Sequence, residues 1–176
     1  MKFPTLLSLL TLTGLVAAGP PPKPPKPPGT TYLYTVNITG GATYPVGPGP
    51  YGNRLVVPIL NGTFSGPRLK GTVMPVGGEW GVLDTSHPSQ TAFHIDVRQT
   101  FKTDDGAYIQ VIEGGSSQPD GSAFATMRFD TGSEKYYWMN NIVAFGVLRQ
   151  LGGGGLTIDC WMFNTPPATA PPGPPA

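Results

Sequence analysis

The strongest constraint on the fold is a two-residue periodicity of apolar side chains, which recurs along a chain that shows no sustained helical periodicity. In "YLYTVNIT", residues 32–39, Tyr32, Tyr34, Val36 and Ile38 share one face of an extended strand. Further strand-like runs occupy 53–60, 62–74, 91–101, 107–113, 122–130, 140–150 and 156–163. Eight or more short strands at close spacing predict an all-β antiparallel barrel or sandwich.

Turn-forming residues separate the runs, and the chain contains 25 glycines and 22 prolines. Asp105-Gly106 lies between two strand patterns and is the strongest hairpin signal, so Asp104 and Asp105 are interpreted as turn residues. One short helical turn is expected within 132–140. Other turns are expected at Gly114-Gly115, Pro119-Asp120-Gly121, Thr131-Gly132 and 152–155.

The two ends of the chain differ from its middle. Residues 1–18 read as a secretory signal peptide cleaved near Ala18, because an apolar run follows Lys2 and ends in small residues. Residues 19–29 and 165–176 are rich in proline, which fixes its own backbone angle and lacks an amide donor, so disordered extended tails are expected. The folded domain is therefore predicted at 30–164, in a secreted protein with no membrane span.

Charge and cysteine content argue against several classes of partner. Residues 30–164 hold eight basic and ten acidic side chains, which favours neither a nucleic acid nor an anionic membrane. Cys160 is the single cysteine, so an intramolecular disulfide and a zinc site built from paired cysteines are both excluded. We expect no metal and no cofactor, and a small molecule as the partner; the sequence does not specify an oligomeric state.

Two sequons, Asn37-Ile38-Thr39 and Asn61-Gly62-Thr63, are candidate glycosylation sites in a secreted protein. Each requires an asparagine that faces outward, so their use depends on the orientation of the strands.

A dense group of ionisable residues opens the run "HIDVRQTF". His94, Asp96 and Arg98 fall on one face of the expected strand, and apolar side chains such as Ile95 and Val97 fall on the other. The polar face looks either at water or into a cavity, and the pattern leaves both orientations open.

Three stretches have a recognisable order and content: 66–84 with Gly-Pro-Arg-Leu-Lys-Gly and Gly-Gly-Glu-Trp, 94–115 with Asp-Val-Arg and Thr-Asp-Asp-Gly-Ala, and 128–146 with Trp-Met-Asn. They resemble the domain-of-unknown-function 3237 family of fungi and bacteria, and the similarity runs through nearly all of 32–163. The resemblance implies a single small antiparallel β-barrel of about eight to ten strands with a ligand-sized interior. Some fungal relatives look like cofactor-independent cyclases or isomerases of secondary metabolism. Glu79 stands where aspartate is common in the family.

Inside such a barrel the candidate catalytic residues are Glu79, Asp96 and Arg98. A carboxylate in an apolar pocket has a raised pKa and acts as a general acid or base near neutral pH. Arg98 stabilises a developing oxyanion or enolate, with Asn140 as a second donor. The candidate substrate-binding residues are Trp80, His94, Trp138 and Asn140.

Structural explanations stand beside these roles. Asp96 and Arg98 also fit an ion pair that holds a strand in register, and Trp80 and Trp138 also fit the core. The leading interpretation is a secreted barrel that binds a small hydrophobic or aromatic metabolite, as a cofactor-independent cyclase or isomerase. The alternatives are a non-catalytic carrier of small molecules and a structural protein associated with the cell wall.

Overall fold

The computed structural model describes residues 26–87 and 90–164. The predicted signal peptide, most of the predicted linker and the C-terminal tail lie outside the described residues, and the domain boundaries stay predictions. In chain order the elements are β1 (Thr30–Gly40), β2 (Tyr44–Gly49), β3 (Gly52–Ser65), β4 (Lys70–Glu79), β5 (Val82–His87), β6 (Gln90–Thr103), β7 (Tyr108–Ser117), β8 (Ala123–Asp130), the 3-10 helix η1 (Glu134–Asn141), β9 (Ala144–Gln150) and β10 (Gly155–Phe163).

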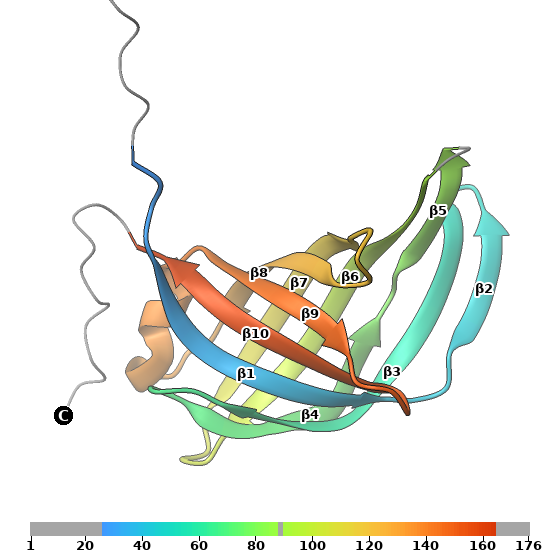
Figure 1. Cartoon of the computed structure of the whole chain (residues 1–176). Helices are drawn as coiled ribbons and strands as arrows, with labels where there is room; N and C mark the ends of the chain where they lie inside the picture. The colour runs from blue at the N-terminus through green and yellow to red at the C-terminus, as the bar shows by residue number, and fades with distance from the viewer. Residues whose placement is uncertain (1–25, 88–89, 165–176) are drawn as a thin grey trace, which may run out of the picture.

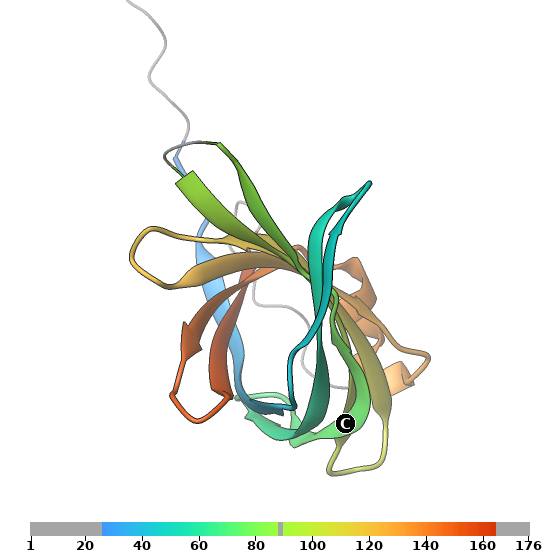
Figure 2. The same ribbon diagram turned by 90° about the vertical axis from the view of Figure 1, so that its right-hand side faces the viewer.

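Within these described ranges, eight strands close an antiparallel barrel in the order β1–β10–β9–β8–β7–β6–β4–β3, and β3 pairs with β1 to complete it (Figure 1). Strands β2 and β5 pair with the barrel strands and extend beyond one end of it, as Figure 2 shows from that side. Closure gives each barrel strand two paired neighbours and so removes exposed edges. The prediction of a single antiparallel β-barrel is confirmed.

Strand β8 illustrates why the alternating sequence folds in this way. Ala125, Met127 and Phe129 are buried in the barrel, and each residue between them is exposed. A pleated strand turns successive side chains to opposite faces, so one face joins the core and the other meets solvent. The two-residue periodicity therefore encodes the inner and outer surfaces of the barrel.

Some strand limits differ from the prediction. The run predicted at 62–74 is divided, because the chain turns between the end of β3 and the start of β4. The turn predicted at Gly114-Gly115 is wrong, since both glycines lie within β7. A Cβ on Gly115 would lie 1.9 Å from the carbonyl oxygen of Phe124, so this glycine permits close approach of β8. The short helical turn expected within 132–140 is present as η1.

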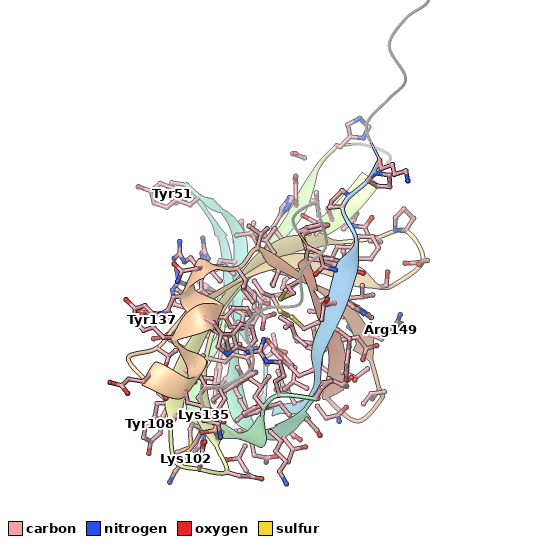
Figure 3. The ribbon with its side chains drawn as sticks, turned by 90° about the vertical axis from the view of Figure 1, so that its left-hand side faces the viewer. Tyr51, Lys102, Tyr108, Lys135, Tyr137 and Arg149 are labelled. Atoms are coloured by element: carbon pink, nitrogen blue, oxygen red, sulfur yellow. The ribbon has the colours of Figure 1, made fainter. Side chains whose placement is uncertain are left out.

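Aromatic rings fill one end of the barrel, which we call the packed end. Phe64 and Phe101 stack with their centroids 4.3 Å apart, and the ring of Tyr34 meets Phe101 edge-on at 5.5 Å. Helix η1 lies along one side of this end (Figure 3) and buries Tyr136 and Met139 against the core. Such aromatic pairs add stability beyond the apolar area they bury. In the described part of the chain, no helix has the length and apolar character needed to cross a membrane.

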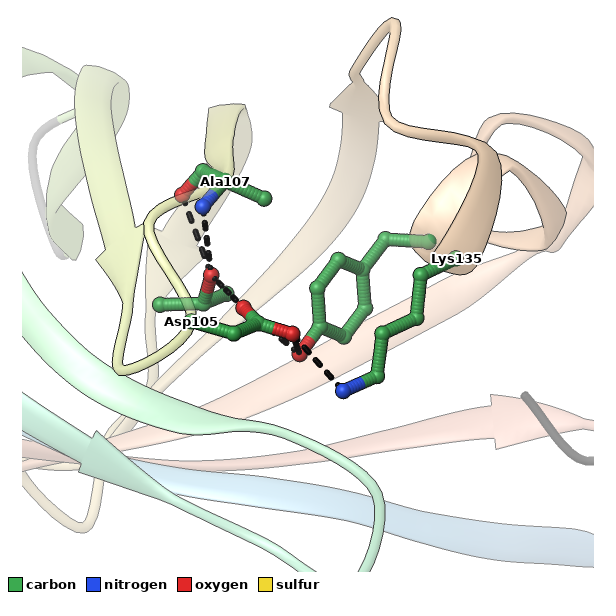
Figure 4. Close-up of polar contacts among 5 residues, drawn as sticks. Asp105, Ala107 and Lys135 are labelled. Atoms are coloured by element: carbon green, nitrogen blue, oxygen red, sulfur yellow. Dashed lines mark hydrogen bonds and ion pairs between the residues drawn. The ribbon is translucent and has the colours of Figure 1, made fainter. Parts of the chain in front are cut away.

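Asp105 connects the β6–β7 hairpin to η1 at the packed end (Figure 4). Its carboxylate accepts hydrogen bonds from Thr103 Oγ1, from Lys135 Nζ at 2.7 Å and from the Tyr136 hydroxyl at 3.1 Å. The neighbouring Gly106 has a φ of 94°, which suits a glycine in the predicted hairpin turn. The interpretation of Asp105 as a turn residue is confirmed, and the residue also ties two elements together.

Candidate functional site

A cavity of about 590 Å³ occupies the opposite end of the barrel, on the side of β2 and β5. Its volume lies in the usual range for sites that bind small molecules. Glycine-rich turns, 152–155 among them, form part of its wall. Most of the remaining lining is apolar and comes from Ile38, Leu55, Val57, Ile59, Phe93, Ile95, Val97, Leu148, Leu156 and Ile158.

Two carboxyl groups interrupt this apolar lining: Glu79 at the end of β4 and Glu113 in β7. The register pairs Glu79 with Val97 of β6, and Val97 with Glu113. Residues directly opposite each other in an antiparallel sheet point to the same face, so both acids lie on the inner face with Val97 between them. Two strand spacings separate the backbones of the two acids by about 10 Å.

Glu113 is buried, with 2% of its surface exposed. Gln99, which is also buried, donates a hydrogen bond from Nε2 to Glu113 Oε1. Burial raises the pKa of Glu113 to about 7, the hydrogen bond from Gln99 opposes the rise, and the charge of Glu79 adds to it. The acid therefore exchanges its proton near neutral pH.

Glu79 is half-buried, and its Oε1 accepts a hydrogen bond of 2.8 Å from the backbone N–H of Asp96. Desolvation raises the pKa of Glu79 to about 7, although the backbone hydrogen bond opposes the rise. The absence of a side chain at Gly81 makes this arrangement fit. A Cβ there would lie 2.0 Å from the ring of Phe93 and 2.9 Å from Glu79 Oε1.

Strand β6 settles the orientation that the sequence left open. Ile95 and Val97 point inward, and His94 and Arg98 are exposed on the outer surface. Arg98 Nη1 lies 2.6 Å from Asp96 Oδ1 in a largely solvent-exposed ion pair. His94 lies 2.8 Å from Ser116 Oγ on the same surface. These three predicted site residues therefore lie outside the cavity, and the geometry supports the interpretation of Asp96 and Arg98 as an ion pair along the strand.

The tryptophans and Asn140 also lie apart from the cavity lining. Trp138 is on η1 at the packed end, where the guanidinium of Arg68 lies 3.6 Å from its ring centroid. Asn140 accepts a hydrogen bond from the Thr131 N–H and donates one to the Thr131 carbonyl, both at 2.9 Å. Trp80 is half-buried after β4, and its carbonyl accepts a hydrogen bond from Arg54. Of the seven predicted catalytic and substrate-binding residues, the structure places Glu79 in the cavity.

The sequon asparagines Asn37 and Asn61 are both exposed. The pairing of β1 with β3 sets Asn37 opposite Thr63, and Asn61 opposite Thr39. Both side chains therefore have the outward orientation that a glycan requires, and their modification stays a prediction.

The described residues contain no group of three or more His, Cys, Asp or Glu side chains arranged to hold a metal ion. Cys160 is buried, and desolvation raises the pKa of its thiol far above the usual range, so it stays in the unreactive protonated form. The two carboxyl groups, Glu79 and Glu113, are therefore the acid–base groups that the structure brings to the cavity.

The sequence pattern of the family described as "Protein of unknown function (DUF3237)" matches residues 28–126 and 112–163. The chain belongs to this family. The resemblance inferred from three sequence stretches is thereby confirmed, and the match spans the whole barrel.

Proteins of similar sequence and structure share this barrel fold. The chain is 32% identical over 148 residues to the hydroalkoxylation enzyme phnH of Penicillium herquei, covering 83% of this chain and 89% of that protein. A β-barrel-like protein from Acinetobacter baumannii superposes with a TM-score of 0.71 at 28% identity, over 80% of this chain and 99% of that one. The crystal structure of an enzyme from Penicillium herquei gives 0.66 at 27% identity, over 81% and 99%.

Sequence reasoning missed Glu113 and Gln99, although the signal was present in both strands. Glu113 continues the inward series Ile109, Val111 of β7, and Gln99 continues the inward series of β6. A polar residue at an inward position of an otherwise apolar series is a candidate site residue.

Proposed function

We propose that this member of the family catalyses an acid–base addition of a hydroxyl group across a carbon–carbon double bond of the same small molecule, without a cofactor. The product is a cyclic ether with the same atoms as the substrate. The observation that carries the proposal is the pair of carboxyls, Glu79 and Glu113, on one inward row of an apolar cavity. The relation to a hydroalkoxylation enzyme supports this class of reaction.

The two acids supply what the addition needs. One carboxylic acid protonates a carbon of the double bond, and the other, as a carboxylate, removes the proton of the attacking hydroxyl. One C–O bond and one C–H bond form while the O–H bond and the C=C π bond break, so the reaction needs no oxidant or reductant. Exchange of protons with solvent restores both carboxyls for the next turnover.

The cavity also indicates the charge of the substrate. Its described lining contains no Lys, Arg or His, and two carboxyls face an interior built largely of aliphatic side chains. An anionic ligand would meet these acids without a compensating cation, which is costly in a low-dielectric site. We therefore expect an uncharged, mostly apolar molecule that carries a hydroxyl group.

The test uses alkenols and alkenyl phenols, which combine a hydroxyl and a double bond in one molecule, incubated with the full chain in D₂O. Cyclisation keeps the mass of the skeleton, removes vinyl proton signals from the NMR spectrum and places one deuterium on carbon. Glu79→Gln and Glu113→Gln are each expected to lower the rate by about 100-fold or more. Glu134→Gln is the matched control, because this exposed glutamate lies on η1.

Two outcomes would contradict the proposal. Full turnover in both Glu→Gln variants would show that the reaction needs neither Glu79 nor Glu113. Binding of the same molecules without any conversion would instead favour the carrier interpretation.

The pH profile gives an independent test. Glu79 and Glu113 both have a pKa of about 7, and the reaction needs one of them protonated and the other ionised. The rate should therefore be highest near pH 7, fall at lower pH as the base becomes protonated, and fall at higher pH as the acid loses its proton. A rate that rises or falls in a single step across pH 5–9 would show that one carboxyl suffices.

We further propose that the protein is secreted and glycosylated. Residues 1–18 have the pattern of a signal peptide, and the outward orientation of Asn37 and Asn61 supports modification. N-terminal sequencing of the protein recovered from culture medium should begin after Ala18. Treatment with a glycosidase specific for N-linked glycans should reduce its mass, and the double variant Asn37→Gln, Asn61→Gln should show no such change.

A further inference from the structure

Gln99 and Glu113 form a buried pair in which each side chain has one oxygen without a hydrogen-bond partner among the described residues. Gln99 Nε2 donates to Glu113 Oε1, which leaves Gln99 Oε1 and Glu113 Oε2. When Glu113 is ionised, both of these atoms are acceptors and neither can donate to the other. Buried acceptors without a donor cost free energy, so the ionised pair is unfavourable.

Protonation of Glu113 supplies the missing donor. A carboxylic acid presents one acceptor and one donor, and a side-chain amide presents one donor and one acceptor. With the proton on its Oε2, Glu113 has a donor to offer to Gln99 Oε1. Glu113 Oε1 keeps the hydrogen bond from Gln99 Nε2. The pair is therefore complementary in the neutral form of the acid.

Glu79 has a different partner. Its Oε1 accepts from the backbone N–H of Asp96 at 2.8 Å, and a backbone N–H can only donate. A donor of this kind stabilises a carboxylate. Glu79 is also half-buried, whereas Glu113 is 2% exposed, so ionisation costs less at Glu79.

The other ionisable groups that act on Glu113 from the surrounding strands reinforce the difference. Tyr34 of β1 and Cys160 of β10 interact with it electrostatically, and burial raises the pKa of both, so they remain neutral. Glu79 of β4 is the other carboxyl that acts on Glu113, and a negative charge on Glu79 disfavours a second negative charge on Glu113.

We propose that Gln99 is a positioning residue that keeps a proton on Glu113, so that Glu113 enters the reaction as the acid and Glu79 as the base. The location of the proton follows from the structure of the pair, whereas the two roles rest on the proposed function. A polar side chain that contacts no substrate would thus divide two chemically identical groups into a donor and an acceptor of protons.

The experiment is infrared spectroscopy of the full chain without substrate, titrated from pH 5 to pH 9, because the C=O stretch of a protonated carboxylic acid is separate from that of a carboxylate. As the pH rises, the band of a buried protonated carboxyl should persist in the wild type and in Glu79→Gln beyond the pH at which Glu113→Gln has lost it. In Gln99→Met the band should move to higher frequency, because the acid loses the N–H donor to its carbonyl oxygen. Gln110→Met, at an exposed position of β7, is the matched control and should leave the band unchanged.

A band that persists in Glu113→Gln and disappears in Glu79→Gln would overturn the proposal, as would a band that Gln99→Met leaves unchanged. Circular dichroism checks that each variant folds, and Gln99→Asn, which shortens the side chain and keeps its polarity, replaces Gln99→Met if that protein does not fold. In turnover, Gln99→Met should lower kcat by about tenfold or more and change KM by less than about threefold, as expected for the loss of a positioned acid. An unchanged kcat would contradict the role of Gln99.

The two proposals fail separately. The infrared result requires no substrate, so the expected band without any cyclisation would refute the proposed function and leave the proton on Glu113. Cyclisation together with the protonated band on Glu79 would support the function and reverse the two roles.

Discussion

Glu113 illustrates at the scale of one residue how a site can reduce the stability of its protein. Burial raises its pKa from 4.5 to about 7, so the folded chain holds this proton at pH values where the unfolded chain has released it. The contribution of Glu113 to stability is therefore most favourable below about pH 4.5, declines as the pH rises to about 7, and stays low above that.

Glu113→Gln should consequently stabilise the protein at alkaline pH. Glutamine remains neutral, so the variant avoids the cost of burying a carboxylate, which amounts to as much as about 3 kcal/mol for a shift of this size. Urea unfolding at pH 8 should show a higher free energy of unfolding than the wild type, and unfolding at pH 4 should show little difference. Glu134→Gln should change neither value, and a destabilised Glu113→Gln at pH 8 would refute the argument.

The pKa of Asp105 is shifted in the opposite direction from that of Glu113. Hydrogen bonds from Lys135 and Thr103 hold the pKa of this carboxyl well below its usual value of 3.8. A lowered pKa contributes stability that is present above the unfolded value and is lost as the pH falls through and below it. Because the side chain is substantially exposed, solvent screens the interaction.

Asp105→Asn should therefore lower the free energy of unfolding at pH 7 by no more than about 1 kcal/mol. The difference from the wild type should shrink as the pH falls below about 4, because the carboxyl of the unfolded wild-type chain becomes protonated while that of the folded chain is still largely ionised. Thermal unfolding at several pH values measures both effects. A difference that grows toward low pH would contradict the assigned sign.

At the scale of the element, strand β7 contains two adjacent glycines with opposite surroundings. A Cβ on Gly115 would lie 1.9 Å from the Phe124 carbonyl oxygen, whereas the nearest atom to a Cβ on Gly114 is the Ile95 carbonyl oxygen at 3.9 Å. One position permits the close approach of two strands, and the other has room for a side chain. Sequence alone reads the pair as a turn, because the difference lies in the neighbouring strand.

Alanine substitutions should separate the two glycines. Gly115→Ala is expected to destabilise the barrel by about 1–3 kcal/mol, because β7 and β8 must move apart to admit the methyl group. Gly114→Ala is expected to be neutral or to stabilise by about 0.5 kcal/mol through the reduced freedom of the unfolded chain. Chemical denaturation of both variants checks the contrast, and equal effects would argue against the tight contact at Gly115.

At the scale of the whole molecule, the barrel divides into a packed end and an end with a cavity. Rings such as Phe64 and Phe101 fill the packed end, while aliphatic side chains and two acids surround the cavity. A barrel of eight strands has an interior that side chains fill or that holds one small ligand. This barrel combines both arrangements along its axis, so the packed end supplies stability and the cavity supplies the site.

Two isoleucine-to-phenylalanine substitutions test this division. Ile95 lines the cavity, and Ile109 is fully buried outside the cavity lining. Ile109→Phe should destabilise by about 1–3 kcal/mol through overpacking, whereas Ile95→Phe should change stability by less than about 1 kcal/mol because its ring enters open space. Ile95→Phe should also abolish binding of the alkenol probes in calorimetry. Equal destabilisation by both substitutions would mean that the cavity cannot accept a larger side chain.

Much of the fold can be predicted from the sequence, because the signals for strands and turns are local. Alternation within each run reveals the two faces of a strand, and Asp105-Gly106 identifies a hairpin whose geometry depends on adjacent residues. The closure of the strands into a barrel came from resemblance to a family. The strands β2 and β5, which pair outside the main ring, had no comparable local signal.

The candidate site depended on long-range pairing. Which face of β6 points inward follows from the packing of the whole barrel. The sequence pattern alone therefore allows Asp96 and Arg98 as site residues, and the barrel structure places them outside. The row Glu79, Val97, Glu113 joins three strands. The β6–β7 hairpin sets Val97 opposite Glu113, and the pairing of β4 with β6, which skips β5, adds Glu79 through a register that no single strand encodes. Alternation thus specifies that each strand has an inside and an outside, and the tertiary pairing decides which polar residues meet there, because a carboxyl gains its perturbed pKa from neighbours distant in sequence.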